Sequence, residues 1–217
     1  MQRKTSKKDK FILVLAILLV VSSVINIFQG RVNIRYKDII QQQCYDEIEV
    51  IRVKNESILK QLDSSINAKS ITNNELMLLY QNYKSAVDAE VNLWEYYFDY
   101  KNNPYIYTEN NNVSLENENK YELYWKIEEL FYNYIQKNLD SNESVITLAN
   151  QQLDDFMVLR EIANEINDYF NQFYDENCKG LSEEERAKAV IKNSYWIDML
   201  KGSEVIMGKY INHQFTY

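Results

Sequence analysis

The sequence predicts an all-α protein in which a single N-terminal transmembrane helix continues into an extracytoplasmic antiparallel, up-and-down bundle of four to five helices. Three observations support this. Residues 11–28 form an uncharged apolar run. The 217 residues include only four Gly and one Pro, whereas turn-rich sandwiches and barrels have chain breakers roughly every 8 to 12 residues. Apolar residues in the rest of the chain recur at intervals of three, four and seven, which is typical of amphipathic helices.

The apolar run reads FILVLAILLVVSSVINIF. As a helix it is about 27 Å long, close to the roughly 30 Å hydrocarbon core of a bilayer. Ser22 and Ser23 can return their hydroxyls to the preceding turn, and Asn26 lies near the far interface. A run of this length favours an uncleaved signal-anchor over a cleaved secretory signal, whose apolar core has about 7 to 15 residues. Small residues at 21–23 keep cleavage open as the alternative.

Charge sets the expected orientation. The first ten residues hold five basic residues and one acidic residue, a net charge of +4. By the positive-inside rule, residues 1–10 are a basic cytoplasmic tail, and residues 29–217 lie outside a cell membrane that the chain crosses once. The whole chain carries −8, so residues 29–217 carry −12. Such an acidic body predicts no nucleic-acid partner, because binding to phosphates depends on Lys and Arg.

The first two exterior helices are long. One is expected over residues 32–68, emerging from the span past Gly30, a candidate kink. Its apolar positions are Tyr36, Ile39, Ile40, Cys44, Ile48, Ile51, Ile58, Leu59, Leu62 and Ile66. Residues 70–74 break it, and a capping box formed by Thr72 and Glu75 opens a second helix that runs to about Tyr100. Its apolar stripe is Leu76, Leu79, Tyr80, Tyr83, Val87, Val91, Trp94 and Phe98.

An Asn-rich loop at residues 101–117 contains Pro104 and separates these helices from the remaining ones. The third helix ends near Asn138 and carries Leu123, Ile127, Leu130, Phe131 and Tyr134. A link at 140–143 opens the fourth helix, which stops near Gly180 and carries Val145, Leu148, Phe156, Leu159, Ile162, Ile166, Tyr169, Phe170 and Phe173. The fifth begins at a capping box formed by Ser182 and Glu185 and carries Val190, Ile197, Leu200, Met207 and Ile211.

Cys44 and Cys178 are the two cysteines of the chain. Counting 1.5 Å per residue along antiparallel helices places them at a similar distance from the membrane. An oxidising exterior would permit a disulfide between them. The alternative is two unpaired thiols, one buried like a small apolar residue and one exposed at a helix end.

Aromatic residues are concentrated at the membrane-facing end of the expected bundle. We interpret them as candidate contacts to the membrane interface or to glycans, because amphipathic rings favour headgroups and stack on sugars. The competing interpretation is core packing of Trp94 and Phe98 with scattered exposed tyrosines. The candidate contact residues are Trp94, Tyr96, Tyr97, Tyr100, Tyr105 and Tyr107.

Catalytic, metal-ligating and cofactor-binding residues are not identified. His213 is the sole histidine and is expected to be solvated on a fraying tail, whereas zinc hydrolase and di-iron sites need two or more histidines. Asp155 lies on or beside the apolar stripe of the fourth helix, and Glu161 with Glu165 forms an ordinary solvent-facing row. We therefore expect no enzyme, no cofactor and no bound metal.

The sequence favours a membrane-anchored, non-enzymatic interaction module at the cell envelope, acting as scaffold, adaptor or inhibitor. Its partners would be the lipid bilayer, through residues 11–28, and an envelope or membrane protein. The alternative function is an extracytoplasmic sensor of a small molecule or of the envelope, working with a signalling partner. The apolar stripe of the first exterior helix could instead support coiled-coil self-association through residues 32–66. The sequence leaves the oligomeric state open.

Overall fold

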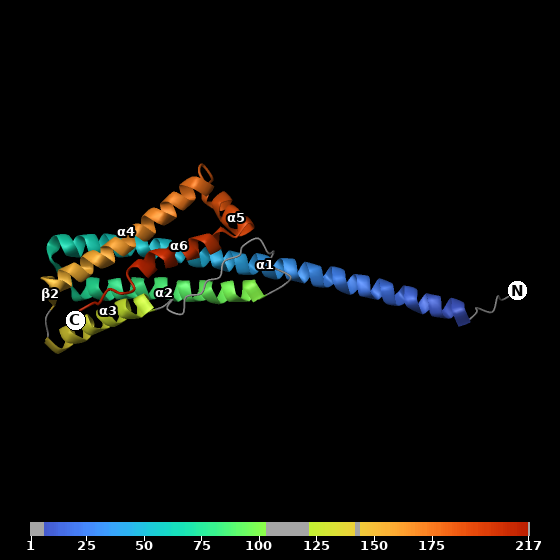
Figure 1. Cartoon of the computed structure of the whole chain (residues 1–217), viewed down its shortest axis with the longest axis horizontal. Coiled ribbons are helices and arrows are strands. Elements are labelled where there is room, and N and C mark those ends of the chain that lie inside the picture. The colour runs from blue at the N-terminus through green and yellow to red at the C-terminus, as the bar shows by residue number, and fades with distance from the viewer. Residues whose placement is uncertain (1–6, 103–121, 142–143, 217) are drawn as a thin grey trace.

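Helix α1 (Lys7–Ala68) dominates the architecture, because it projects far beyond the elements packed against its second half (Figure 1). The computed structural model describes residues 7–102, 122–141 and 144–216. Gly30 does not interrupt α1, since one glycine disfavours a helix by only about 1 kcal/mol relative to alanine. Ser23 Oγ donates to the Leu19 carbonyl over 2.9 Å, as expected for a hydroxyl within an apolar helix. The expected membrane span and first exterior helix are thus one element.

The first half of α1 stands apart from the bundle. Among the described residues, α1 is the one helix long and apolar enough to cross a membrane, and its apolar window is unburied. Exposure continues through Tyr36 and Ile39, which the apolar pattern had placed on the packed stripe. Burial begins at Ile40 and continues through Ile48 and Leu62. The bundle therefore starts about ten residues beyond Gly30 rather than directly after the span.

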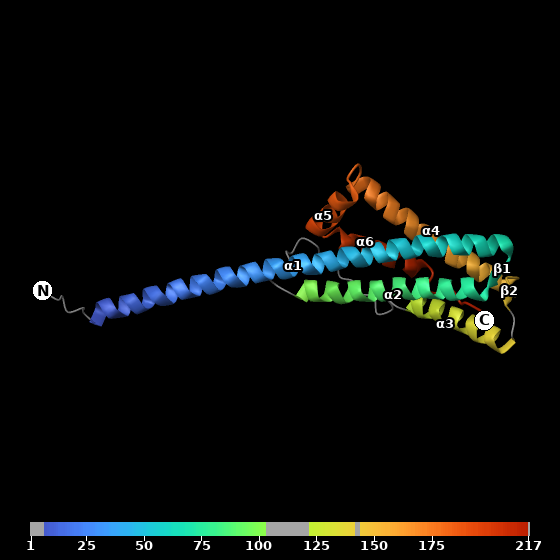
Figure 2. The same cartoon turned by 180° about the vertical axis from the view of Figure 1, so that it is seen from behind.

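Helix α2 (Asn73–Asn102) runs back along α1 in the opposite direction (Figures 1 and 2). Asn92 Nδ2 donates to Glu47 Oε1 over 2.8 Å, and Lys54 Nζ donates to Asn82 Oδ1 over 3.3 Å, which fixes the relative height of the two helices. The capping box before α2 is confirmed. The Glu75 amide donates to Thr72 Oγ1, and the Thr72 amide donates to the Glu75 carboxylate.

A small antiparallel sheet closes the end of the bundle far from the N-terminus. Strand β1 (Ser70–Thr72) pairs with β2 (Val145–Thr147) in the register Ser70↔Thr147, Ile71↔Ile146 and Thr72↔Val145. The predicted fourth helix included Val145 and Leu148, and this prediction was wrong. The short β-branched segment pairs with β1 instead, and α4 (Gln151–Asn177) begins only after it.

The remaining helices cover α1 and α2. Helix α3 (Glu122–Ser141) packs on α2, while α4 starts beside α1 and leans away from it toward its own C-terminal end (Figures 1 and 2). Asn55 Nδ2 bonds the Ala163 carbonyl over 2.7 Å and ties α1 to α4. Helices α5 (Glu183–Asn193) and α6 (Tyr195–Lys209) were expected as a single helix. They are separated because Ser194 adopts a left-handed conformation with φ 55°.

Candidate binding sites

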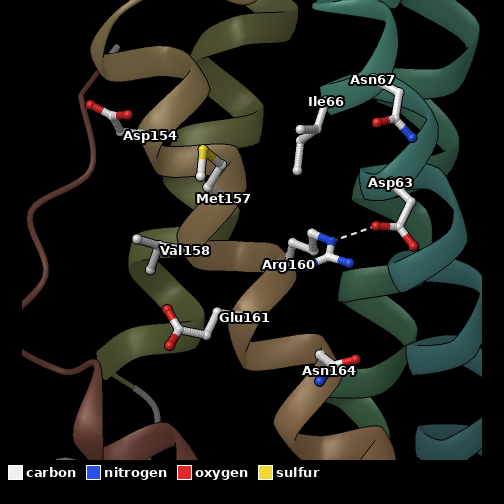
Figure 3. Close-up of a pocket in the computed structure, with 9 residues that line it drawn as sticks. All are labelled: Asp63, Ile66, Asn67, Asp154, Met157, Val158, Arg160, Glu161 and Asn164. Carbon is white, nitrogen blue, oxygen red and sulfur yellow. Dashed lines mark hydrogen bonds and ion pairs between the residues drawn. The ribbon is translucent and has the colours of Figure 1, made fainter.

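A groove of about 940 Å³ lies between the distal parts of α1 and α4. Figure 3 shows Arg160 reaching from α4 across to Asp63 on α1, with which it forms an ion pair. Three acidic residues and one arginine make the groove polar and net acidic. Its lining residues are Asp63, Ile66, Asn67, Asp154, Met157, Val158, Arg160, Glu161 and Asn164.

A second concave site, which we call the α3 pocket, has a volume of about 410 Å³. It is lined by Tyr80 of α2 and by Trp125, Glu128, Glu129 and Tyr132 of α3. Tyr80 donates its hydroxyl to Glu128 Oε1 over 3.1 Å. Trp125 is 67% exposed and Tyr132 is 53% exposed, so the site presents aromatic faces and carboxylates to solvent.

The α3 pocket follows from the two faces of its helix. The inner face is buried on α2, as the sequence pattern predicted, through Leu123, Ile127, Leu130, Phe131 and Tyr134. Trp125 and Tyr132 lie seven residues apart on the outer face, and the two glutamates lie between them at helical spacing. Leu139, seven residues further along, is also exposed. This outer stripe was not among the predicted features, although its seven-residue spacing is a usable signal.

A buried carboxyl group joins α2 to α3 and lies near Glu204 of α6. Glu90 is only 2% exposed and accepts a hydrogen bond from the Tyr124 hydroxyl. Burial raises the pKa of Glu90 to about 7, and the nearby charge of Glu204 adds to the increase, while hydrogen bonds from Tyr124 and Trp94 oppose it. Glu90 was not among the predicted site residues either. Its position on the same helical stripe as Val87 and Trp94 was the available signal.

The segment after α6 is docked on the bundle through Asp155, which is fully buried on α4. Asp155 Oδ2 accepts from the Thr216 amide and hydroxyl, each at 2.9 Å, and Oδ1 lies 3.0 Å from His213 Nε2. The expectation of a solvated His213 was therefore wrong, because the imidazole is half-buried against this carboxylate. Glu161 is exposed, and Glu165 is partly exposed in the same row, where it pairs with Lys209 at 2.6 Å and accepts from Tyr210.

The candidate interface aromatics divide into three groups. Trp94 and Tyr97 are buried in the core, where their rings pack edge-to-face, so neither offers a surface to lipid or glycan. Tyr96 is half-buried against the same core. The side chain of Tyr100, and all of Tyr105 and Tyr107, lie outside the described residues, as does most of the expected 101–117 loop.

Cys44 and Cys178 are both free and buried, so the candidate disulfide is absent from this structure, and neither thiol is exposed at a helix end. Their neighbours differ. The Cys44 thiol lies near Glu47 and Tyr96, on the side of α1 that faces α2. Cys178 caps the end of α4, where Arg186 of α5 is its charged neighbour. The two thiols therefore lie in different electrostatic surroundings.

No group of three or more potential metal-ligating His, Cys, Asp or Glu side chains occurs within the described parts of the chain. Comparison with known proteins assigns no activity to these sites: no family model, curated protein or solved structure matches the chain.

Proposed function

We propose that this protein is a single-pass, membrane-anchored interaction module that presents its helical bundle outside the membrane to a protein partner, as a scaffold, adaptor or inhibitor. The observation that carries the proposal is the continuity of α1. Its residues 11–28 expose every large apolar side chain, and the same helix then supplies the buried core positions of the bundle. A lipid-facing segment and a folded bundle are joined without a flexible linker between them.

The extracytoplasmic orientation rests on the five basic residues within the first ten, which are retained on the cytoplasmic side by the positive-inside rule. A non-enzymatic role is supported by the position of the sole histidine. His213 contacts Asp155 and the ring of Phe215 in the docked C-terminal segment. It lines neither the groove between α1 and α4 nor the α3 pocket.

Crosslinking in intact cells, followed by affinity purification from membranes and mass spectrometry, tests the proposal. We expect one protein to be recovered in near-stoichiometric amount with the tagged chain and not with an unrelated single-pass protein expressed at the same level. Recovery of no specific protein, or of cytosolic proteins alone, would contradict the proposal.

A sensor is the second candidate function, and the groove between α1 and α4 favours it. A ligand held there would contact α1 directly, and α1 continues unbroken into the apolar span. Native mass spectrometry of the purified protein separates the two functions. A small molecule that co-purifies with the wild type and is lost in Arg160→Gln supports the sensor, whereas an unliganded mass together with a crosslinked protein supports the interaction module.

A further inference from the structure

We propose that the α3 pocket, formed by Tyr80, Trp125, Glu128, Glu129 and Tyr132, is a docking site for a lysine or arginine side chain presented by a basic segment of the protein partner. This inference rests on the proposed function, because it names the partner chemistry that one surface of the interaction module recognises.

The composition of the pocket matches a cation. Ammonium and guanidinium groups are attracted to the faces of Trp and Tyr rings, and a nearby carboxylate supplies the opposite charge. Trp125, Glu128 and Tyr132 share one face of α3 through their helical spacing, and Tyr80 approaches from α2. Rings and carboxylates thus line a single concavity.

The chain already uses the same chemistry internally. Tyr174 donates its hydroxyl to Glu49 over 2.7 Å, and the guanidinium carbon of Arg186 lies 4.8 Å from the centre of the Tyr174 ring. Tyr80 and Glu128 repeat the tyrosine–glutamate part of this arrangement. Within the described residues, however, no Lys or Arg forms an ion pair with Glu128. Tyr80 and Glu128 therefore supply the aromatic and anionic parts of the arrangement, and no described Lys or Arg supplies the cation to Glu128.

Charge complementarity points to an occupant from another molecule. Residues 29–217 carry a net charge of −12, because the chain carries −8 and its first ten residues carry +4. Lys126 adjoins Trp125 in the sequence, but its ammonium group contacts Glu122 at 2.8 Å and the Ile211 carbonyl at 2.6 Å. It is thereby directed to neighbours that do not line the pocket.

The position of the pocket argues against a lipid headgroup as the source of the cation. The contact between Lys54 and Asn82 places Tyr80 level with about residue 56 of α1. Residue 56 is 28 positions beyond the end of the apolar run, or roughly 40 Å along a helix. Headgroups extend only about 5 to 8 Å beyond the hydrocarbon core. A partner polypeptide can reach this height, whereas the headgroups of the anchoring bilayer cannot.

Exposure of Trp125 gives the proposal a specific optical signal. The chain has three tryptophans, of which Trp94 and Trp196 are fully buried. A ligand in the α3 pocket would therefore change the emission of Trp125 selectively. Aromatic residues exposed in this way are enriched at the energetic centres of protein interfaces.

The test uses the full chain in detergent and a short fluorescent peptide of alternating lysine and alanine as the probe. We expect anisotropy to report saturable binding that weakens as salt is raised, with a matched change in Trp125 emission. Trp125→Ala and Glu128→Gln should each weaken binding about fivefold, as expected for loss of one cation–π or ionic contact. Glu176→Gln removes an exposed glutamate from α4 and should leave binding unchanged.

Equal binding of the lysine peptide to wild type, Trp125→Ala and Glu128→Gln would overturn the inference. So would Trp125 emission that responds to a neutral oligosaccharide of glucose or N-acetylglucosamine and not to the peptide. Retention of the crosslinked partner in these variants would show that the interaction module stands and that docking occurs elsewhere. If crosslinking recovers no specific partner even with the wild-type chain, the proposed function itself is contradicted.

Discussion

The two halves of α1 are made of similar apolar residues and have opposite surroundings. Residues 11–28 are apolar around the whole helix and expose all of their large side chains, whereas the second half has one apolar face, buried through Ile48, Ile58 and Leu62. A helix that is apolar all round needs an apolar environment on every side, which a bilayer provides. A helix with one apolar stripe needs partner helices, which α2 and α4 provide. Angular distribution, rather than apolar content, separates the two halves.

Charged substitutions in the first half of α1 should have the largest effect, which is on membrane anchoring. Leu15→Lys combined with Leu18→Lys should release the protein from membranes, because each lysine near the centre of a span disfavours insertion by about 3 kcal/mol. Val50→Lys with Val53→Lys places the same charges at exposed positions of the second half and should leave the protein anchored. The fraction of each double variant that stays in the membrane pellet after alkaline extraction measures its anchoring. An anchored Leu15/Leu18 variant would remove the distinction between the halves.

The same leucine-to-alanine substitution in each half of α1 sharpens the comparison. Leu62→Ala should lower the free energy of unfolding of the bundle by about 2 to 5 kcal/mol, since Leu62 is fully buried. Leu18→Ala should change it by less than about 0.5 kcal/mol, because Leu18 has no bundle neighbour. Urea unfolding in detergent, followed by tryptophan fluorescence, compares the two variants. Similar effects would indicate that residues 11–28 pack against the bundle.

The buried carboxyl of Glu90 makes the packed region pH-sensitive. Its pKa is about 7 in the folded protein and near its ordinary value of 4.5 when unfolded. The folded state therefore binds the proton more tightly, and this contribution to stability is full below pH 4.5 and is lost as pH rises through 7. Glu90→Gln keeps an acceptor for Tyr124 and should be more stable than the wild type at pH 8 by up to about 3 kcal/mol. The free energy of unfolding of both proteins, measured from pH 4 to pH 8, checks this. Curves that run parallel across that range would contradict the prediction.

Glycine substitutions should have the smallest effects. A Cβ at Gly202 of α6 would meet the Tyr169 ring, whose hydroxyl donates to the Asp198 carbonyl over 2.7 Å. Displacing that ring should outweigh the gain in helix propensity, so Gly202→Ala should lose about 1 kcal/mol. A Cβ at Gly208 of the same helix would meet no atom within 4 Å. Gly208→Ala should therefore stabilise the protein by up to about 1 kcal/mol. Equal changes in melting temperature would show that Tyr169 moves freely.

The helices were largely predictable because their apolar residues repeat with helical spacing and their starts carry local signals. The capping boxes of Thr72 with Glu75 and of Ser182 with Glu185 lie within four residues and depend on no distant contact. The β1–β2 pairing was not predictable in this way, since three-residue strands have no resolvable period and Ile71 meets Ile146 only through the tertiary fold.

The candidate sites were less accessible to sequence reasoning for the same physical reason. Asp155 could be placed near the core, but its partners His213 and Thr216 are about 60 residues away and arrive only when the last segment docks. The α3 pocket requires Tyr80 from another helix, although the outward spacing of Trp125 and Tyr132 is local. Helical periodicity shows which face is buried, whereas a polar site depends on which helices become neighbours.

The most direct test of the central claim is labelling of intact cells with a membrane-impermeant, amine-reactive reagent, followed by mass spectrometry of modified lysines. If α1 crosses the membrane and holds the bundle outside, the exposed Lys84 and Lys188 will be labelled in intact cells, while Lys8 and Lys10 will be labelled only after permeabilisation. Labelling of Lys84 and Lys188 only after permeabilisation would contradict the account.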